Sequence, residues 1–218
     1  MRHPNLRAVV AAAVPVMAAL VVFGVSFGVL AVAGGIPGWQ AVLMSAIVFA
    51  GSAQFAAVAV IAGGGTALAA IVSGGLLNTR YIATGVVAGR VLPGGPVRRA
   101  LEGQLIVDES FALGVAASGD PGKPDPEATL ISGALLWASW VAGTALGALL
   151  GPVVGDPSRY GLDAAFPALF VALLWPLLAS RRAVRCALGG AVVALLLAPW
   201  TPAGVPLAGA AVAGLVLA

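Results

Sequence analysis

The chain has 218 residues, of which 61% are hydrophobic and only 9% are charged, and its formal net charge is +3. Soluble domains carry about 25% charged residues, so this composition excludes a soluble globular protein and predicts an all-α, multi-pass membrane protein. The arginines lie mainly near the ends of apolar segments, where they bear on membrane orientation, and we expect no nucleic-acid partner. A single cysteine, Cys186, and a single histidine, His3, give no basis for a disulfide framework, a metal site or a cofactor.

The apolar sequence divides into seven or eight segments, because a transmembrane helix needs about 20 mainly apolar residues. Glycine and proline clusters such as GGIPG and DPGKPDPE separate them. We predict one integral membrane transporter domain over residues 1–218. The predicted segments are Ala8–Ala33, Trp39–Ala62, Thr66–Gly89, Gln104–Ser118, Ala128–Leu150, Ala164–Ala179, Ala183–Leu197 and Val205–Ala218.

The orientation of these segments is not settled by simple alternation. Basic residues cluster near Arg7, around Arg98 and around Arg182, and the positive-inside rule places all three clusters in the cytoplasm. Eight alternating crossings cannot satisfy this. Either one segment is re-entrant or half-crossing, or one cluster faces outward.

Small residues at four-residue spacing recur in residues 8–90 and 128–200 and predict two related three-helix units, although chance in Gly/Ala-rich helices is the alternative. The units would run parallel if Gln104–Ser118 crosses the membrane, and inverted if it does not.

Arg80 lies within the apolar stretch LLNTRYIATG, where a guanidinium costs from roughly 2.5 to more than 10 kcal/mol unless it is compensated. In a continuous helix Asn78 would point nearly opposite to Arg80, so the two reach one ligand only if the helix is interrupted. We predict this interruption at Gly74–Gly75. The alternative is a segment shifted earlier in the sequence, with Arg80 reaching the membrane surface from its end.

Two other stretches place polar groups in apolar surroundings. QLIVDESFAL contains Asp108, which shares a helix face with Gln104, and Glu109, which points about a quarter-turn away. The two carboxyl groups are candidates for a partner of Arg80, an ammonium site or a proton carrier, and acids of a hydrated interfacial helix are the alternative. FAGSAQF contains Ser52 and Gln54, which we treat as candidate substrate contacts. Gln54 is equally suited to holding two helices together, at roughly 0.6–2 kcal/mol.

Together, FAGSAQF on an early segment, the Asn-x-Arg of LLNTRY on the next, and DESFAL after a basic loop resemble the AzlC family of bacterial branched-chain amino acid permeases. The resemblance is most specific in the part of the chain before Asp120. It implies the large subunit of an exporter in the cytoplasmic membrane. It further implies valine, leucine, isoleucine and sometimes methionine as substrates, and a small AzlD-type membrane protein as partner.

The chemistry of such a substrate is compatible with these residues. A branched-chain amino acid is a zwitterion with a small apolar body, so we expect Arg80 and Asn78 to face its carboxylate. Asp108 or Glu109 would face its ammonium group or carry the coupling proton. With no nucleotide-binding motif, transport would draw on a proton or ion gradient.

Two other classes of function differ in how well they fit the sequence. An enzyme is not expected, because the chain has no HExxH, no GxSxG and no histidine within an apolar segment. The remaining alternative is a channel or a non-transporting subunit in which Arg80 forms a structural salt bridge with Asp108 or Glu109.

Overall fold

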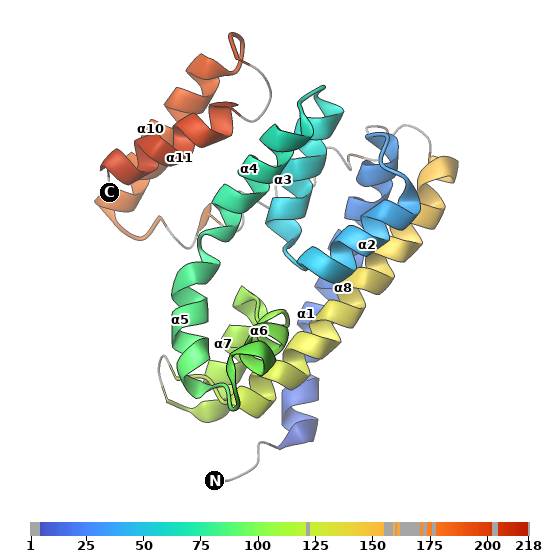
Figure 1. The fold of residues 1–218 in the computed structure, drawn as a ribbon, viewed down its shortest axis with the longest axis vertical. Helices are drawn as coiled ribbons and strands as arrows, with labels where there is room; N and C mark the ends of the chain where they lie inside the picture. Colours follow the sequence, from blue (N-terminus) through green and yellow to red (C-terminus); the bar gives the residue numbers. More distant parts are fainter. Residues whose placement is uncertain are drawn as a thin grey trace.

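A computed structural model describes residues 5–120, 123–154, 159, 161, 171, 174–175, 178–201 and 205–217. Within these residues the chain forms helices and no strand, which confirms the all-α class (Figure 1). The helices are α1 (Leu6–Ala33), α2 (Gly38–Val48), α3 (Gly51–Ala62), α4 (Ala67–Asn78), α5 (Tyr81–Val91), α6 (Pro96–Gly103), α7 (Asp108–Ser118), α8 (Pro126–Val154), α10 (Arg181–Leu197) and α11 (Val205–Leu217). The predicted segment Ala164–Ala179 lies mostly outside the described residues.

The two longest helices, α1 and α8, run parallel and side by side (Figure 1). Among the described residues they are the helices that are long and apolar enough to cross a membrane. Glycines allow their backbones to touch: a Cβ atom on Gly24 would lie 2.8 Å from the carbonyl oxygen of Trp140, and one on Gly147 would overlap that of Val25. Small residues at such contacts are a usual basis of helix association in lipid.

Helices α2 and α3 form a hairpin that descends beside α8 only to its middle and then returns (Figure 1). The chain reverses at Phe49, whose φ of 42° is left-handed. Each helix is about 17 Å long, roughly half of the ~30 Å thickness of a bilayer core. The predicted continuous span Trp39–Ala62 is therefore wrong, because a left-handed residue divides it into two half-crossing helices.

The third predicted segment is interrupted, but at Thr79–Arg80 and not at Gly74–Gly75. The Thr79 hydroxyl donates to the carbonyl oxygen of Leu76 at 2.6 Å, and the Thr79 amide donates to the same oxygen at 3.2 Å. These bonds compete with the helical bond that this carbonyl would make four residues on. Gly74 stays within α4 and lets it approach α3, because its Cβ would lie 3.4 Å from the carbonyl oxygen of Ala53.

Helices α6 and α7 form a second hairpin, which enters from the opposite end of the molecule (Figure 1). Gly114 of α7 lies against Thr129, near the start of α8, whereas Leu105 lies against Gly133, further along it. The turn between α6 and α7 is thus the innermost part of this hairpin. Gln104 caps the end of α6 and Asp108 begins α7, so the predicted single helix from Gln104 is wrong.

The tips of the two hairpins meet near the middle of α8. The Gln104 side-chain amide donates a hydrogen bond to the carbonyl oxygen of Ile47, in the last turn of α2. Trp137 of α8 donates to the neighbouring carbonyl oxygen of Ala46 at 2.9 Å. Irregular backbone at membrane depth is tolerated only where protein or a watery cavity surrounds it, and the two tips provide this protection for each other.

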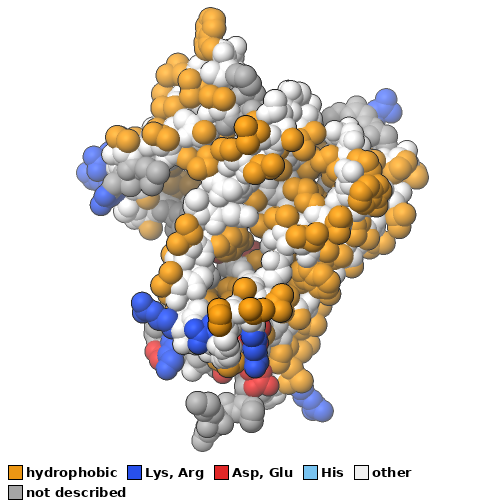
Figure 2. Space-filling model, in the orientation of Figure 1, with side chains coloured by type: hydrophobic (Ala, Val, Ile, Leu, Met, Phe, Trp, Pro, Cys, Tyr) orange, Lys and Arg blue, Asp and Glu red, His pale blue; other side chains and the backbone are white. Residues whose placement is uncertain are grey.

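The half-crossing hairpin α2–α3 also explains how two of the three basic clusters lie on the same side of the membrane. Because that hairpin returns to its starting side, the N-terminal end of α1 and the loop after α5 lie at the same end of the molecule (Figure 1). Charged side chains gather at this end, whereas hydrophobic side chains cover much of the flank above it (Figure 2). Arg7 and Arg98 therefore share one side, as the positive-inside rule requires. We call it the arginine-rich side.

The C-terminal helices α10 and α11 pack on each other and contact α4 through α11. They confirm the helical character of the segments predicted at Ala183–Leu197 and Val205–Ala218, with bounds shifted by a residue or two. Part of the second unit of the predicted repeat, residues 128–200, lies outside the described residues, so the repeat stays a prediction.

The contact between α1 and α8 predicts the effect of a single methyl group. Gly147→Ala places a Cβ where the Val25 carbonyl oxygen lies, and should lower the free energy of unfolding by about 1–3 kcal/mol. Gly75→Ala is the matched control, because no atom lies within 4 Å of its added Cβ. Thermal unfolding of the two variants in detergent checks this, and equal melting temperatures would contradict the packing described.

Candidate functional site

A cavity of about 180 Å³ lies where the hairpin tips, the α4–α5 interruption and the middles of α1 and α8 converge. We call it the central cavity. One wall of the cavity is polar and the other is apolar. The polar wall is formed by Arg80, Tyr81, Ser52, Asp108 and Glu109, and the apolar wall by Leu20, Phe23, Phe49, Phe55, Val107 and Trp140.

The polar wall is organised around Arg80. Its Nη1 atom lies 3.1 Å from Oδ2 of Asp108, and its Nη2 atom donates to Ser52 Oγ at 3.0 Å and to Tyr81 Oη at 3.1 Å. The guanidinium carbon also lies 4.9 Å from the centre of the Tyr81 ring, within cation–π range. The side chains of Arg80 and Asp108 are 38% and 47% exposed, so this ion pair faces the cavity.

The central cavity contains two neighbouring carboxyl groups, those of Asp108 and Glu109. In the described part of the chain, no group of three or more His, Cys, Asp or Glu side chains is placed to hold a metal ion. Asp108 and Glu109 are instead set beside a guanidinium, an arrangement suited to a ligand that carries both signs of charge.

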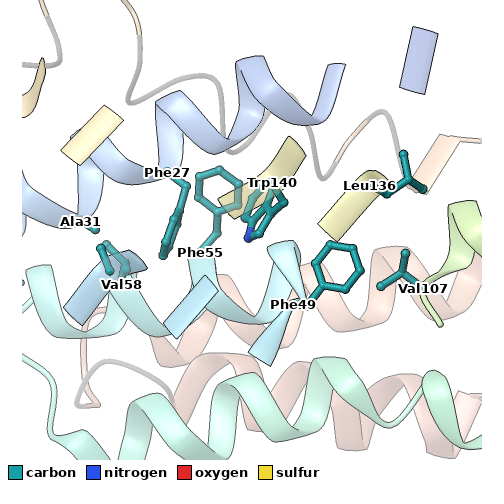
Figure 3. Packing of buried hydrophobic residues seen from close by; sticks show 9 residues of the cluster. Phe27, Ala31, Phe49, Phe55, Val58, Val107, Leu136 and Trp140 are labelled. Atoms are coloured by element: carbon teal, nitrogen blue, oxygen red, sulfur yellow. The ribbon is translucent and has the colours of Figure 1, made fainter. Parts of the chain in front are cut away.

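The apolar wall is built from aromatic side chains of different helices. Phe27, Phe55 and Trp140 pack with ring centres 5.3–5.9 Å apart, and Phe49 and Val107 lie beyond them towards the hairpin tips (Figure 3). Phe27 is fully buried behind this wall, whereas Phe55 and Trp140 also line the cavity. Aromatic packing of this kind gives the wall a fixed shape.

Three helices begin at the central cavity. The first turns of α3, α5 and α7 contribute Ser52, Tyr81 and Asp108 to its lining. A helix N-terminus carries partial positive charge and backbone N–H groups without helical partners. Discontinuous helices whose N-termini point at an anionic substrate group are a recurrent device of secondary transporters.

Gln54 is fully buried and connects the first hairpin to α8. Its Oε1 accepts from the Ala50 amide at 3.2 Å and from Trp140 Nε1 at 3.1 Å, and its Nε2 donates to Ser45 Oγ at 3.0 Å. Ser45 in turn bonds to the Thr144 hydroxyl at 2.8 Å. These bonds satisfy the backbone where the chain leaves the left-handed turn. Gln54 does not line the central cavity.

Asn78 faces a different space from Arg80, so the expectation that both address one ligand in the central cavity is not met. Asn78 and Gln54 line a groove of about 330 Å³ between α2, α3 and α4, and Asn78 Oδ1 is buried without a hydrogen-bond partner among the described residues. The physical reason is that Thr79 and Arg80 keep helical backbone angles. The interruption breaks hydrogen bonds without reorienting the two side chains.

Tyr81, Phe23 and Trp140 line the central cavity but were not predicted. The sequence could have indicated Tyr81, because a phenol that directly follows an arginine in a membrane segment is suited to contact its guanidinium. Phe23 and Trp140 have no such signal, since aromatic residues are common in apolar helices and only packing brings these two together with Arg80.

The half-crossing helices and the amphipathic cavity at their tips define a helical membrane protein. Discontinuous helices around a cavity are a recurrent feature of secondary transporters. The AzlC protein family matches residues 15–154. The chain therefore belongs to the AzlC family, membrane proteins generally linked to branched-chain amino acid transport.

A relative supports the membrane assignment. The chain is 34% identical over 185 residues to a protein of Archaeoglobus fulgidus described as an uncharacterized membrane protein, and the alignment covers 83% of this chain and 79% of the relative. No solved structure matches.

Gln54→Leu should destabilise the protein. Leucine leaves the Ala50 amide and Trp140 Nε1 without an acceptor, and each buried unpaired donor costs about 1–3 kcal/mol, so we expect a loss of about 2–4 kcal/mol. Gln40→Leu, at an exposed position of α2, is the matched control. The melting temperatures of the purified variants check this, and a Gln54→Leu protein as stable as wild type would contradict the role of Gln54 at the turn.

Proposed function

We propose that this protein is a secondary transporter that exports branched-chain amino acids across the cytoplasmic membrane. The observation that carries the proposal is the central cavity, which sets a guanidinium and two carboxyl groups opposite an aromatic and aliphatic wall. A free amino acid with an apolar side chain has the matching distribution of charge and apolar surface.

The Arg80–Asp108 ion pair provides a way to bind such a zwitterion without leaving a charge unpaired. The substrate carboxylate would take the place of Asp108 on Arg80, and the substrate ammonium group would take the place of Arg80 on Asp108 or Glu109. Ser52 and the first turns of α3 and α7 would add donors to the carboxylate. Each charged side chain thus keeps a partner of opposite charge throughout the exchange. This avoids the cost of an unpaired charge at membrane depth.

The size of the cavity favours a small solute. Its volume of about 180 Å³ lies below the roughly 300–1,000 Å³ that is usual for drug-sized ligands. Leu20, Phe23 and Phe49 would contact the substrate side chain. A branched aliphatic group would pack against these residues more favourably than a polar group. Valine, leucine and isoleucine are accordingly the proposed substrates, with methionine as a further candidate.

The remaining parts of the proposal rest on the family and on sequence chemistry. A proton or ion gradient would supply the energy, with Asp108 or Glu109 as the coupling group. The partner would be a small AzlD-type membrane subunit. We propose no enzymatic activity and no cofactor.

The alternative is a channel or non-transporting subunit in which Arg80 is structural. The observation in its favour is the Arg80–Asp108 contact itself, at 3.1 Å. The partial exposure of both side chains to the cavity argues for an exchangeable pair, because a ligand in the cavity can reach either charge.

Efflux of amino acids from dipeptide-fed cells tests the transport proposal. With an AzlD-type partner co-expressed, wild type should export valine, leucine and isoleucine, and Arg80→Ala should reduce export by about tenfold or more at equal membrane level. Arg80→Lys should stay impaired, because lysine lacks the planar fork that bonds Ser52, Tyr81 and Asp108 together. Arg90→Ala, at an exposed position at the end of α5, is the matched control and should export normally. No export of these amino acids by wild type would contradict the proposal.

A charge swap separates the two readings of Arg80. In the double variant Arg80→Asp with Asp108→Arg, the ion pair can re-form with its polarity reversed, so the protein level in the membrane should recover relative to Arg80→Asp alone. We expect export to stay absent, because the guanidinium would then project from α7 and not from the α4–α5 interruption. Recovery of both level and export would instead favour the structural ion pair.

A further inference from the structure

A second cavity, of about 290 Å³, lies between α5 and α6. One of its ends is formed by Tyr81 and Ile106, at the depth of the central cavity, and the other by Leu92 and Arg99, on the arginine-rich side. Tyr81 lines both cavities, so its side chain stands between them. We call this second space the α5–α6 cavity.

The glycines of the α5–α6 cavity differ from those that pack helices together. Between α1 and α8, a Cβ atom added to Gly24 or Gly147 would strike the backbone of the facing helix. Gly85 and Gly89 of α5 and Gly103 of α6 also stand at an interface between two helices, yet no atom lies within 4 Å of an added Cβ at any of them. Small residues here leave a gap between the helices and do not close it.

On both α5 and α6, the residues that line the gap and the apolar side chains that would contact lipid lie on different faces of the helix. On α5, Thr84, Gly85 and Ala88 line the cavity, whereas Ile82 and Val86 are 69% and 54% exposed on another face. On α6, Arg99 and Ala100 line the cavity, whereas Val97 and Leu101 are exposed away from it. Apolar side chains thus flank the gap on its outer sides, and between its ends the wall is made mainly of small residues.

Arg99 indicates what fills the outer end of the gap. Its exposed guanidinium requires water or a counter-ion, and lipid tails supply neither, so we expect water to enter the cavity from this end. Its charge also favours solutes that carry a carboxylate.

We infer that the α5–α6 cavity is an aqueous passage between the arginine-rich side and the central cavity, and that Tyr81 is the barrier that closes it. Arg80 holds Tyr81 in place through the hydrogen bond to its hydroxyl at 3.1 Å and the cation–π contact at 4.9 Å. A carboxylate bound to Arg80 competes for the same guanidinium and so weakens its hold on Tyr81. This last link rests on the proposed function, whereas the passage itself does not.

Thiol labelling tests the passage without any transport measurement. Cys186→Ser removes the native thiol, and single cysteines are then introduced at Gly85 and Gly89, where the structure has room for a side chain. A membrane-impermeant, negatively charged methanethiosulfonate, added from the arginine-rich side of sealed vesicles, should modify them about tenfold faster than a cysteine at Val86 on the lipid-facing side of the same helix. Arg7→Cys, exposed at the start of α1, reports which side of the vesicle faces outward. Equal or slower modification at Gly85 and Gly89 would overturn the passage.

The role of Tyr81 is tested in the same background with a cysteine at Ser52, on the far side of the barrier. Tyr81→Ala should speed its modification from the arginine-rich side about tenfold, without changing the rate at Val86→Cys. Tyr81→Phe retains the ring and should give a rate close to that of wild type. A rise at both positions would show general loosening of the structure, and no rise at Ser52 would show that Tyr81 is not the barrier; either result overturns this assignment. Because no amino acid is involved, these outcomes stand apart from the success or failure of the efflux experiment.

Discussion

The hydrogen bonds of Gln54 hold the reversal of α2 and α3 at the middle of the molecule, and the position of the central cavity follows from that reversal. A chain that turns back at membrane depth leaves backbone groups without helical partners, where each unsatisfied group costs several kcal/mol. Gln54 accepts the Ala50 amide, and its bonds to Trp140 and Ser45 tie the turn to α8. Phe49 can therefore keep a left-handed backbone, and α3 can begin at the cavity.

The glycine contacts between α1 and α8 complement this turn. They bring two long helices close enough to act as a fixed wall, against which both hairpins rest from opposite ends (Figure 1). The continuous helices α1 and α8 thus provide the main packing interface, whereas Arg80, Ser52 and Asp108 lie at the ends of short helices. The same residue type has opposite uses, since glycine closes the α1–α8 interface and leaves the α5–α6 interface open.

The central and α5–α6 cavities share Tyr81, and Arg80 contacts both Tyr81 and Asp108. One guanidinium is therefore linked to a carboxylate, a hydroxyl of the first hairpin and the side chain between the cavities. In such a network, a ligand that changes the partners of the guanidinium changes all of these contacts together. On the proposed function, these contacts would link solute binding to opening of the passage.

The sequence by itself determined the membrane class, the helical content and the family, and it singled out candidate polar residues, because composition and short motifs such as LLNTRY and DESFAL are local properties of the chain. Only the tertiary structure decided which of those residues share a cavity. Asn78 and Arg80 are separated because helical backbone angles persist through the interruption, and Phe23 and Trp140 join the site through packing between distant segments. The half-crossing of Trp39–Ala62 was likewise hidden, because its turn uses a left-handed phenylalanine where glycine is the usual residue, and Gln54, which holds this turn, is itself anchored by Trp140 of a distant helix.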